Sequence, residues 1–194
     1  MPEHDQLIRK VLGSNYLELG LLRLIVEEKP EQQVAVKMSI SERGTPVDVE
    51  GTGVGLVDAM YAALLGRYGR EYQSLHSIQV VEFTVAAELA TKNGKIGLDA
   101  VAKVELDVVN SEGRRFAFAD SSRSMTTSSA RAVLAMVQYF LNAERAFITL
   151  DHARRDASER GREDLVSRYT AEMAEVVEST SYAEVIDAIR KRLR

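Results

Sequence analysis

The residues best suited to chemistry in this sequence are three glycines at alternate positions, Gly51, Gly53 and Gly55. They follow a short stretch of alternating apolar and polar residues and precede a run with the apolar period of a helix. Glycine permits positive φ and lets another group approach the backbone closely. The first turn of a helix also carries unpaired amide N–H groups at the positive end of the helix dipole. The spacing therefore suits a carboxylate or phosphate bound by the backbone, and the simpler alternative is a tight turn that binds nothing.

The other residue types that support catalysis lack the spacing that catalysis requires. His4, His76 and His152 are scattered and do not have the spacing of metal ligands. Cysteine is absent, which excludes disulfides, thiolate zinc sites and cysteine nucleophiles. The serine- and threonine-rich segment 121–129 contains no Gly-x-Ser-x-Gly elbow, and helix capping explains it more simply. We therefore expect a protein that is not an enzyme, with no catalytic residues, no metal and no cofactor.

Length and composition narrow the class of protein further. The 194 residues suffice for one ample core, or for one domain with an appendage. The apolar content of 45% and charged content of 28% are typical of soluble globular proteins. A formal charge of −4 argues against nucleic acid or an anionic membrane as the main partner. No apolar run approaches the roughly 20 residues that span a bilayer, and residues 1–10 lack the apolar core of a signal peptide, so we expect a cytoplasmic protein.

Periodicity predicts two similar units along the chain. After a short helix in residues 1–13, the first unit, at about 17–70, has strands at 17–28, 33–42 and 46–50 and a helix at 54–67. The second unit, at about 77–143, has strands at 77–90, 98–109 and 114–120 and a helix at 125–143. The alternation changes phase between Leu21 and Leu22, which predicts a β-bulge in the first strand. The pattern predicts an α+β fold of duplicated βββα units, with antiparallel sheets and helices on one face. Antiparallel hairpins also make the glycines a poor dinucleotide site, because that site needs a parallel unit.

The composition changes from residue 150 onward. A run of mixed charges occupies 151–164, and apolar residues at helical spacing follow it. Ser181 and Glu184 have the spacing of a capping box, which predicts a last helix. We therefore divide the chain into a domain at 1–149 and a helical C-terminal extension at 150–194, which we expect to pack on the core or on a partner chain.

Two of these segments resemble the regulatory, or allosteric dimerisation, domain of 2-isopropylmalate synthase and citramalate synthase. In that family a Gly-Asn-Gly-Pro-x-x-Ala turn opens the first helix, and residues 53–59, Gly-Val-Gly-Leu-Val-Asp-Ala, take its place here. A strand tyrosine of the family corresponds to Phe83, and Ala87 follows four residues later. The substitution of the family's asparagine and proline by Val54 and Leu56 makes the turn more apolar.

The resemblance continues through the second unit and covers roughly residues 17–142. The family's Gly-x-Asp-Ala hairpin corresponds to residues 97–100, which include Asp99 and Ala100. The aspartate before the family's closing helix is replaced by Ser124, and Asn142 matches the asparagine at the end of that helix.

The resemblance implies a homodimer that binds a feedback amino acid in a cleft at the dimer interface. The ligand would be a branched-chain amino acid or a related small acid, with its carboxylate at the glycine amides and its ammonium at Asp99. Its side chain would rest on nearby apolar residues. The candidate ligand-binding residues are Gly53, Val54, Gly55, Leu56, Ala59, Phe83, Ala87, Asp99, Ala100 and Ser124.

The catalytic part of that family is a TIM barrel, which needs about 250 residues and exceeds the whole chain. We therefore expect a regulatory module that acts in trans on a synthase subunit. Because the sequence begins with Met1, we expect either a free-standing protein or a fragment of a longer one. The alternative is a structural dimerisation or protein-interaction module with a decayed ligand site, which the apolar Val54 and Leu56 favour.

Overall fold

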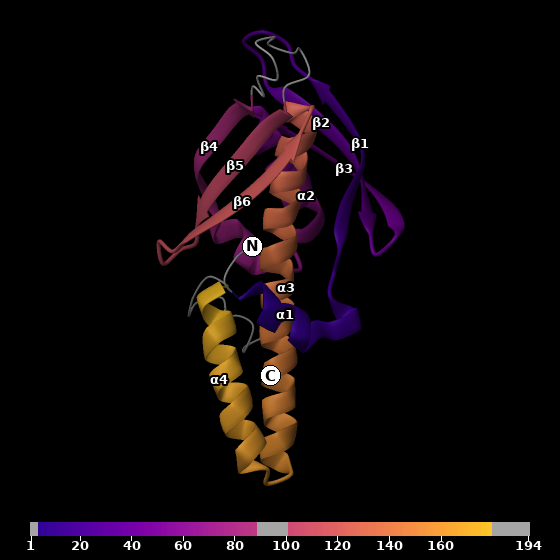
Figure 1. Ribbon diagram of the computed structural model, residues 1–194. Helices are drawn as coiled ribbons and strands as arrows, with labels where there is room; N and C mark the ends of the chain where they lie inside the picture. Colours follow the sequence, from indigo (N-terminus) through magenta and orange to yellow (C-terminus); the bar gives the residue numbers. More distant parts are fainter. Residues whose placement is uncertain (1–3, 89–100, 180–194) are drawn as a thin grey trace.

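The computed structural model describes residues 4–88 and 101–179 and contains two three-stranded antiparallel sheets (Figure 1). A short helix, α1, and a 3-10 turn, η1, precede the first sheet. The bounds of the first unit are α1 Asp5–Leu12, η1 Gly13–Asn15, β1 Leu19–Glu27, β2 Val34–Glu42, β3 Thr45–Gly53 and α2 Leu56–Tyr68. The bounds of the remainder are η2 Gln73–Ser77, β4 Gln79–Glu88, β5 Val101–Val109, β6 Arg115–Ser122, α3 Met125–Glu159 and α4 Glu163–Ser179. The predicted α+β fold of duplicated βββα units is confirmed.

Each sheet buries one face against a helix. In the first sheet, whose order is β1-β2-β3, the alternate residues Val34, Val36, Met38 and Ile40 of the central strand are buried, and α2 packs on β2 and β3. Alternation with period two places these side chains on one face, as in a half-buried antiparallel strand.

The second sheet, β4-β5-β6, packs on α3 in the same manner. Val104, Leu106 and Val108 of the central strand β5 are fully buried. Phe116 and Phe118 of β6 meet Tyr139 and Phe140 of α3 with ring centroids 5.2 to 6.2 Å apart. Tilted and edge-on aromatic contacts of this kind add to the apolar burial that fixes the helix on the sheet.

The predicted bulge in the first strand is confirmed. The pairing of β1 with β2 shifts register between Leu21 and Arg23, which leaves Leu22 as the extra residue, 57% exposed. A second shift lies between Val80 and Glu82 in the pairing of β4 with β5.

The helix predicted at 125–143 is much longer in the structure, because α3 continues to Glu159. The mixed charges of this stretch lie on the helix, where Asp151 forms ion pairs with Arg154 at 2.9 Å and Arg155 at 2.8 Å. Gly161, with a φ of 67°, makes the turn into α4. The predicted boundary at 149/150 therefore falls inside one helix, and the division into two parts stays a prediction. The helix predicted from Ser181 lies outside the described residues.

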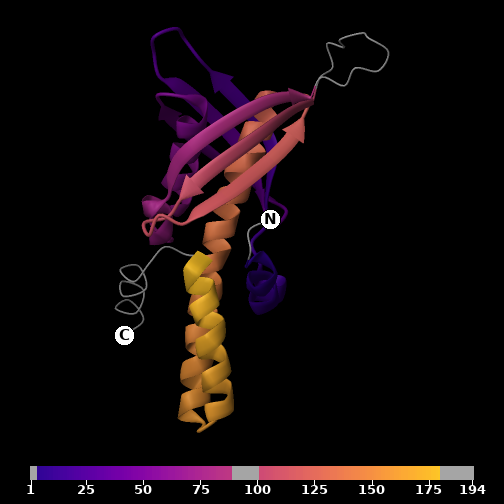
Figure 2. The ribbon, with the colours of Figure 1, turned by 60° about the vertical axis from the view of Figure 1, so that its left-hand side comes forward.

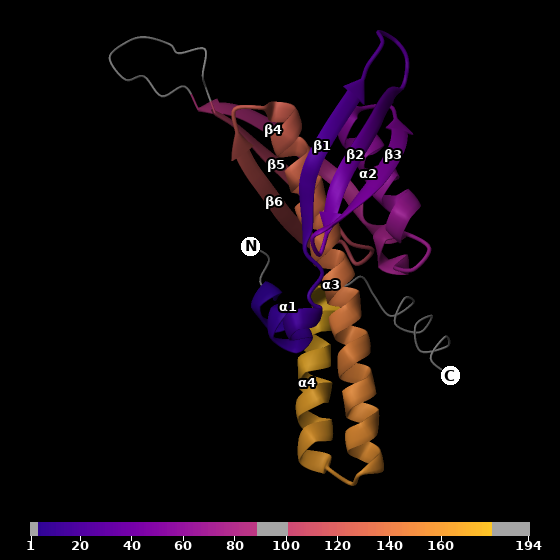
Figure 3. The same ribbon diagram turned by 90° about the vertical axis from the view of Figure 1, so that its right-hand side faces the viewer.

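The long helix α3 forms the axis of the molecule. The two sheets diverge on either side of its first half, and α4 lies antiparallel along its second half (Figures 1 and 3). Figure 2 shows the second sheet crossing the upper part of α3. Among the helices of the described segments, none is both long and apolar enough to span a membrane.

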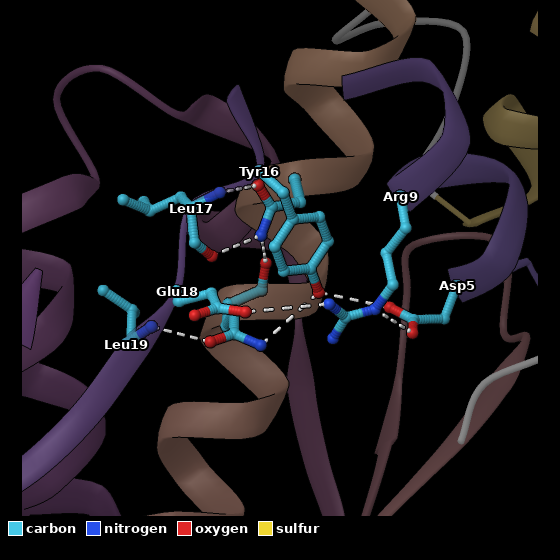
Figure 4. Close-up of polar contacts among 8 residues, drawn as sticks. Asp5, Arg9, Tyr16, Leu17, Glu18 and Leu19 are labelled. Carbon is cyan, nitrogen blue, oxygen red and sulfur yellow. Dashed lines mark hydrogen bonds and ion pairs between the residues drawn. The ribbon is translucent and has the colours of Figure 1, made fainter. Parts of the chain in front are cut away.

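The segment between α1 and β1 is tied to α3 by polar contacts (Figure 4). The buried carboxylate of Asp5 accepts hydrogen bonds from the Tyr16 hydroxyl at 3.2 Å and from Arg9 Nε at 2.8 Å. The Arg9 guanidinium also lies 4.1 Å from the centre of the Tyr16 ring. Gln138 Oε1 on α3 accepts the Leu19 N–H at 2.7 Å. These contacts fix where β1 begins relative to the axis of the molecule.

Candidate functional site

The glycines singled out in the sequence serve the packing of α2 on β3. Gly51 and Gly53 belong to β3, which extends three residues beyond the strand predicted at 46–50. A Cβ on Gly51 would lie 2.4 Å from the backbone nitrogen of Ala63, and a Cβ on Gly53 would lie 2.5 Å from that of Ala59. Only glycine allows the helix to approach the strand so closely. Gly55 has an extended φ of −148° and open space around it, so positive φ has no part in this turn.

The amides at this turn are partly occupied by the chain's own carboxylate. Gly55 is the N-cap of α2, and its carbonyl accepts the Ala59 N–H at 2.9 Å. Asp58, in the first turn of the helix, accepts the Val54 N–H at 2.9 Å through Oδ2. This reach backward resembles the acidic half of a capping box, and the negative charge also suits the positive end of the helix dipole. The turn is therefore less open to an incoming anion than the sequence predicted.

A groove of about 660 Å³ lies between the beginning of α2 and the beginning of β4. Its lining is mainly apolar, with Asp58 as the charged member, and consists of Val54, Gly55, Leu56, Val57, Asp58, Tyr61, Leu65, Ile78, Val80 and Phe83. Four of the predicted ligand-binding residues, Val54, Gly55, Leu56 and Phe83, therefore lie together.

Tyr61 joins the helix wall of the groove to η2. Its hydroxyl donates a short hydrogen bond to the backbone carbonyl of Leu75, and burial raises the pKa of the phenol above its usual range. The phenol is therefore neutral at physiological pH and acts as a donor. Since Leu75 lies in η2, this bond fixes the segment that leads into Ile78 and β4.

The remaining predicted residues have other surroundings. Ala59 is fully buried and belongs to the core between α2 and β3. Ser124 caps α3 by accepting the Thr127 N–H at 3.2 Å, and it is not among the groove residues. Ala87 pairs with Ala102 in the ladder between β4 and β5. Asp99 and Ala100 lie outside the described residues.

Six groove residues were missed in the sequence: Val57, Asp58, Tyr61, Leu65, Ile78 and Val80. Helical spacing places Val57, Tyr61 and Leu65 on one stripe of α2, which is a signal that could have identified them. An acidic residue in a first helical turn, as at Asp58, is also a recognisable signal. No comparable signal predicts that Ile78 and Val80 lie opposite that stripe.

The groove is continuous with an exposed apolar surface on β4. Val54 at its edge is 86% exposed, and Val80, Val81, Phe83 and Val85 of β4 are 39 to 44% exposed. Monomeric soluble proteins rarely expose contiguous apolar patches of large area. A surface of this composition beside a groove is typical of a binding or assembly site.

Charged side chains also line a second hollow, on the first sheet. A hollow of about 460 Å³ on the first sheet is lined by Arg23, Ile25, Lys37, Met38, Ser39, Asp48, Val49 and Glu50. Within residues 4–88 and 101–179, no three His, Asp or Glu side chains are grouped as metal ligands.

Two comparisons with known proteins bear on this site. The family model of the LeuA allosteric (dimerisation) domain matches residues 4–141, which include α1, both sheets, α2 and the first half of α3. No curated protein matches the chain.

Proposed function

The chain belongs to the LeuA allosteric (dimerisation) domain family, and we propose that it is a non-catalytic regulatory module. In this proposal two copies associate, and each binds a small apolar amino acid or a related acid in the groove between α2 and β4. The bound state then alters the activity of a synthase of amino-acid biosynthesis. Ligand binding and action on a synthase in trans go beyond the family assignment and are the part to be tested.

The proposal depends mainly on the groove between α2 and β4. Small-molecule sites are usually concave, mostly apolar and about 300 to 1,000 Å³ in volume, with a few polar groups that orient the ligand. The groove has a volume of about 660 Å³, an apolar lining and one carboxylate at its edge. The amides of the first helical turn lie beside that carboxylate and lack intrahelical acceptors.

These groups suit an α-amino acid in one orientation. Its ammonium would lie at Asp58, its carboxylate would face the amides of Leu56 and Val57, and its branched side chain would contact Tyr61 and Phe83. This assignment gives Asp58 the role that the sequence resemblance gave to Asp99. The carboxylate of Asp58 disfavours a ligand that is only anionic, so a 2-oxo or hydroxy acid should bind more weakly than the zwitterion.

Isothermal titration calorimetry and thermal melting test the ligand. The wild-type protein would be titrated with leucine, isoleucine, valine, 2-isopropylmalate and acetyl-CoA. A ligand at 100 times its Kd should raise the free energy of unfolding by about 2.7 kcal/mol. Phe83→Ala should weaken binding, whereas Ile25→Ala, at an exposed apolar residue outside the groove, should not. Absence of both heat and a melting shift with every compound would refute the ligand assignment.

A second candidate function is an assembly module without a ligand. Two observations favour it: the exposed Val54 replaces a polar residue of the family's turn, and Asp58 already occupies the Val54 amide. A stable dimer that binds none of the compounds would support this second function. Pull-down with the full chain and with a chain that ends at Gly161, in the turn after α3, would then test whether the segment beyond α3 recruits the synthase.

A further inference from the structure

We propose that the two copies associate through β4, which pairs antiparallel with β4 of the partner so that the two second sheets form one continuous sheet. The inference rests on the proposed homodimer and names the strand that makes it. The sheets have four edge strands, β1, β3, β4 and β6. An unpaired strand edge presents open N–H and C=O groups, and proteins usually protect it with bulges, charges, proline or a covering element.

Two of the other three edges carry such protection. On β3, Pro46 lies near the start, and Asp48 and Glu50 are exposed. Proline cannot donate to an added strand, and charged side chains oppose pairing. On β1, the bulge at Leu22 interrupts the edge and the charged Arg23 follows it, as Glu82 follows the bulge of β4. The difference is that the inner-face residues Leu24 and Val26 of β1 are already partly buried against the core. These two edges are poorly suited to a further strand.

The edge strand β6 offers little exposed apolar surface to an added strand. Its exposed positions Arg115, Ala117 and Ala119 carry a charge or a small side chain, and its large side chains Phe116 and Phe118 are buried against α3. A strand added to β6 would gain little apolar contact. The strand β4 is therefore the edge at which an added strand would bury the most apolar surface.

The strand β4 exposes apolar side chains on the inner face of the sheet. Phe83 lies opposite the buried Leu106, which in turn lies opposite the buried Phe118, so the three form one row across the inner face of the sheet. The exposed fraction rises from 5% at Phe118 and 0% at Leu106 to 39% at Phe83. The apolar row thus ends at an edge that no described residue covers. Val81, 44% exposed, extends the apolar surface at the bulge.

A second copy fits this edge because it continues the row with the same residues. A two-fold axis perpendicular to the sheet gives an isologous contact, in which each strand supplies the same surface. That axis keeps each face of the sheet on its own side, so paired residues must share a face. Pairing centred on Phe83 sets Glu82 opposite Thr84, and pairing centred on Thr84 sets Glu82 opposite Ala86. Either register separates the two Glu82 carboxylates and extends the apolar row across the axis.

Cross-linking of single-cysteine variants tests the pairing, because the natural chain has no cysteine. Glu82, Phe83, Thr84 and Val85 would each be replaced by cysteine, with Leu22→Cys on the exposed bulge of β1 as the control. Residues that face each other across antiparallel strands have Cβ atoms about 4.5 to 5.5 Å apart, within reach of a disulfide or a short bis-maleimide. We expect one maximum of covalent dimer within the β4 series and none for Leu22→Cys.

Sedimentation equilibrium of the wild type and of Val85→Lys gives an independent readout. The two added lysines should weaken the dimer by about tenfold or more, because in either register each would place a charge in the apolar row, opposite the partner's Val81 or the partner's Phe83. Leu22→Lys should leave the dimer unchanged, and circular dichroism should show that both variants fold.

The outcomes separate this inference from the proposed function. A wild-type dimer that gives no β4 cross-link and resists Val85→Lys would overturn the strand pairing and leave the homodimer standing. A wild-type chain that remains monomeric at high concentration would overturn the homodimer itself. If Val85→Lys fails to fold, the cysteine series still decides between these results.

Discussion

The side-chain amide of Asn142 brackets the backbone of Leu17: its Oδ1 accepts the Leu17 N–H at 2.8 Å, and its Nδ2 donates to the Leu17 carbonyl at 2.8 Å. Asn142 is fully buried in the middle of α3, and Leu17 lies two residues before the start of β1. The amide thus gives Leu17 the pair of hydrogen bonds that a neighbouring strand would otherwise provide. Together with Gln138 at Leu19, it attaches the first sheet to the helix of the second unit.

We predict that Asn142→Ala lowers the free energy of unfolding by about 2 to 6 kcal/mol, because two buried backbone groups lose their partners at about 1 to 3 kcal/mol each. Asn142→Asp should also destabilise the fold, since a carboxylate can accept the Leu17 N–H but cannot donate to the carbonyl. Urea denaturation measures both changes. Thr149→Ala, at an exposed position of the same helix, should stay within about 0.5 kcal/mol of the wild type and serves as the control.

The glycine turn gives a second prediction, with a matched control, Gly55, two residues away in the same motif. Gly53→Ala should destabilise the fold by about 1 to 3 kcal/mol, because the new methyl group would meet the backbone of α2. Gly55→Ala should cost less than about 1 kcal/mol, since that position has extended φ and open space. Thermal and urea denaturation of the two variants check the contrast. Equal effects would contradict the close-approach explanation of the motif.

The sequence predicts the strands of this fold better than the end of its longest helix, because the strands have a clear alternation of apolar and polar residues. Alternation identified the strands, and its change of phase after Leu21 located the bulge, because a bulge shifts side chains between faces. The sequence predicts the end of α3 too early, at residue 143, and the change in composition at residue 150 lies within the helix rather than at its end. Residues 144–159 contain neither glycine nor proline, and the stop signal is Gly161. Ionic pairs at helical spacing from Asp151 also favour continuation.

The candidate site was only partly predictable for a different reason. The glycine motif and its helix are local, so Gly55 and Leu56 were identified from their spacing and resemblance. The opposite wall, Ile78 to Phe83, depends on how η2 returns the chain across α2, and that depends on the bond from Tyr61 to Leu75. A contact between a side chain and a distant backbone carbonyl leaves no pattern in one sequence. Gly51 and Gly53 were interpreted as a turn because glycine in a strand under a helix has the same local signature.

Asp58 supplies a third prediction, which separates its capping role from its role at the groove. Asp58→Asn keeps an oxygen that can accept the Val54 N–H but removes the charge at the helix start, so we expect a stability loss of about 0.3 to 1 kcal/mol. Asp58→Ala also removes the acceptor and should cost about 0.5 to 2 kcal/mol. If the carboxylate holds a ligand ammonium, both variants should weaken amino-acid binding far more than they change stability. Calorimetry at temperatures well below the melting transition measures the binding. Unchanged affinity in Asp58→Asn would contradict the proposed orientation of the ligand.

The last prediction concerns the contact between α4 and the hairpin that joins β5 to β6. Arg114 Nη1 donates to Glu178 Oε2 at 2.5 Å, and this hydrogen bond lowers the pKa of the Glu178 carboxyl from its ordinary value of 4.5. A carboxyl whose pKa is lower in the folded state stabilises the fold above its ordinary pKa and loses that contribution as pH falls through the lowered value. We therefore expect Glu178→Gln to reduce the melting temperature at pH 7, and the difference from the wild type to shrink as the pH falls below about 4.5.

Because the pair is exposed, high salt should diminish the effect at pH 7. Asp156→Asn, which removes an exposed ion pair within α3, serves as the control for charge removal alone. A melting difference for Glu178→Gln that stays constant between pH 7 and pH 3 would show that this carboxylate does not hold α4 against the hairpin.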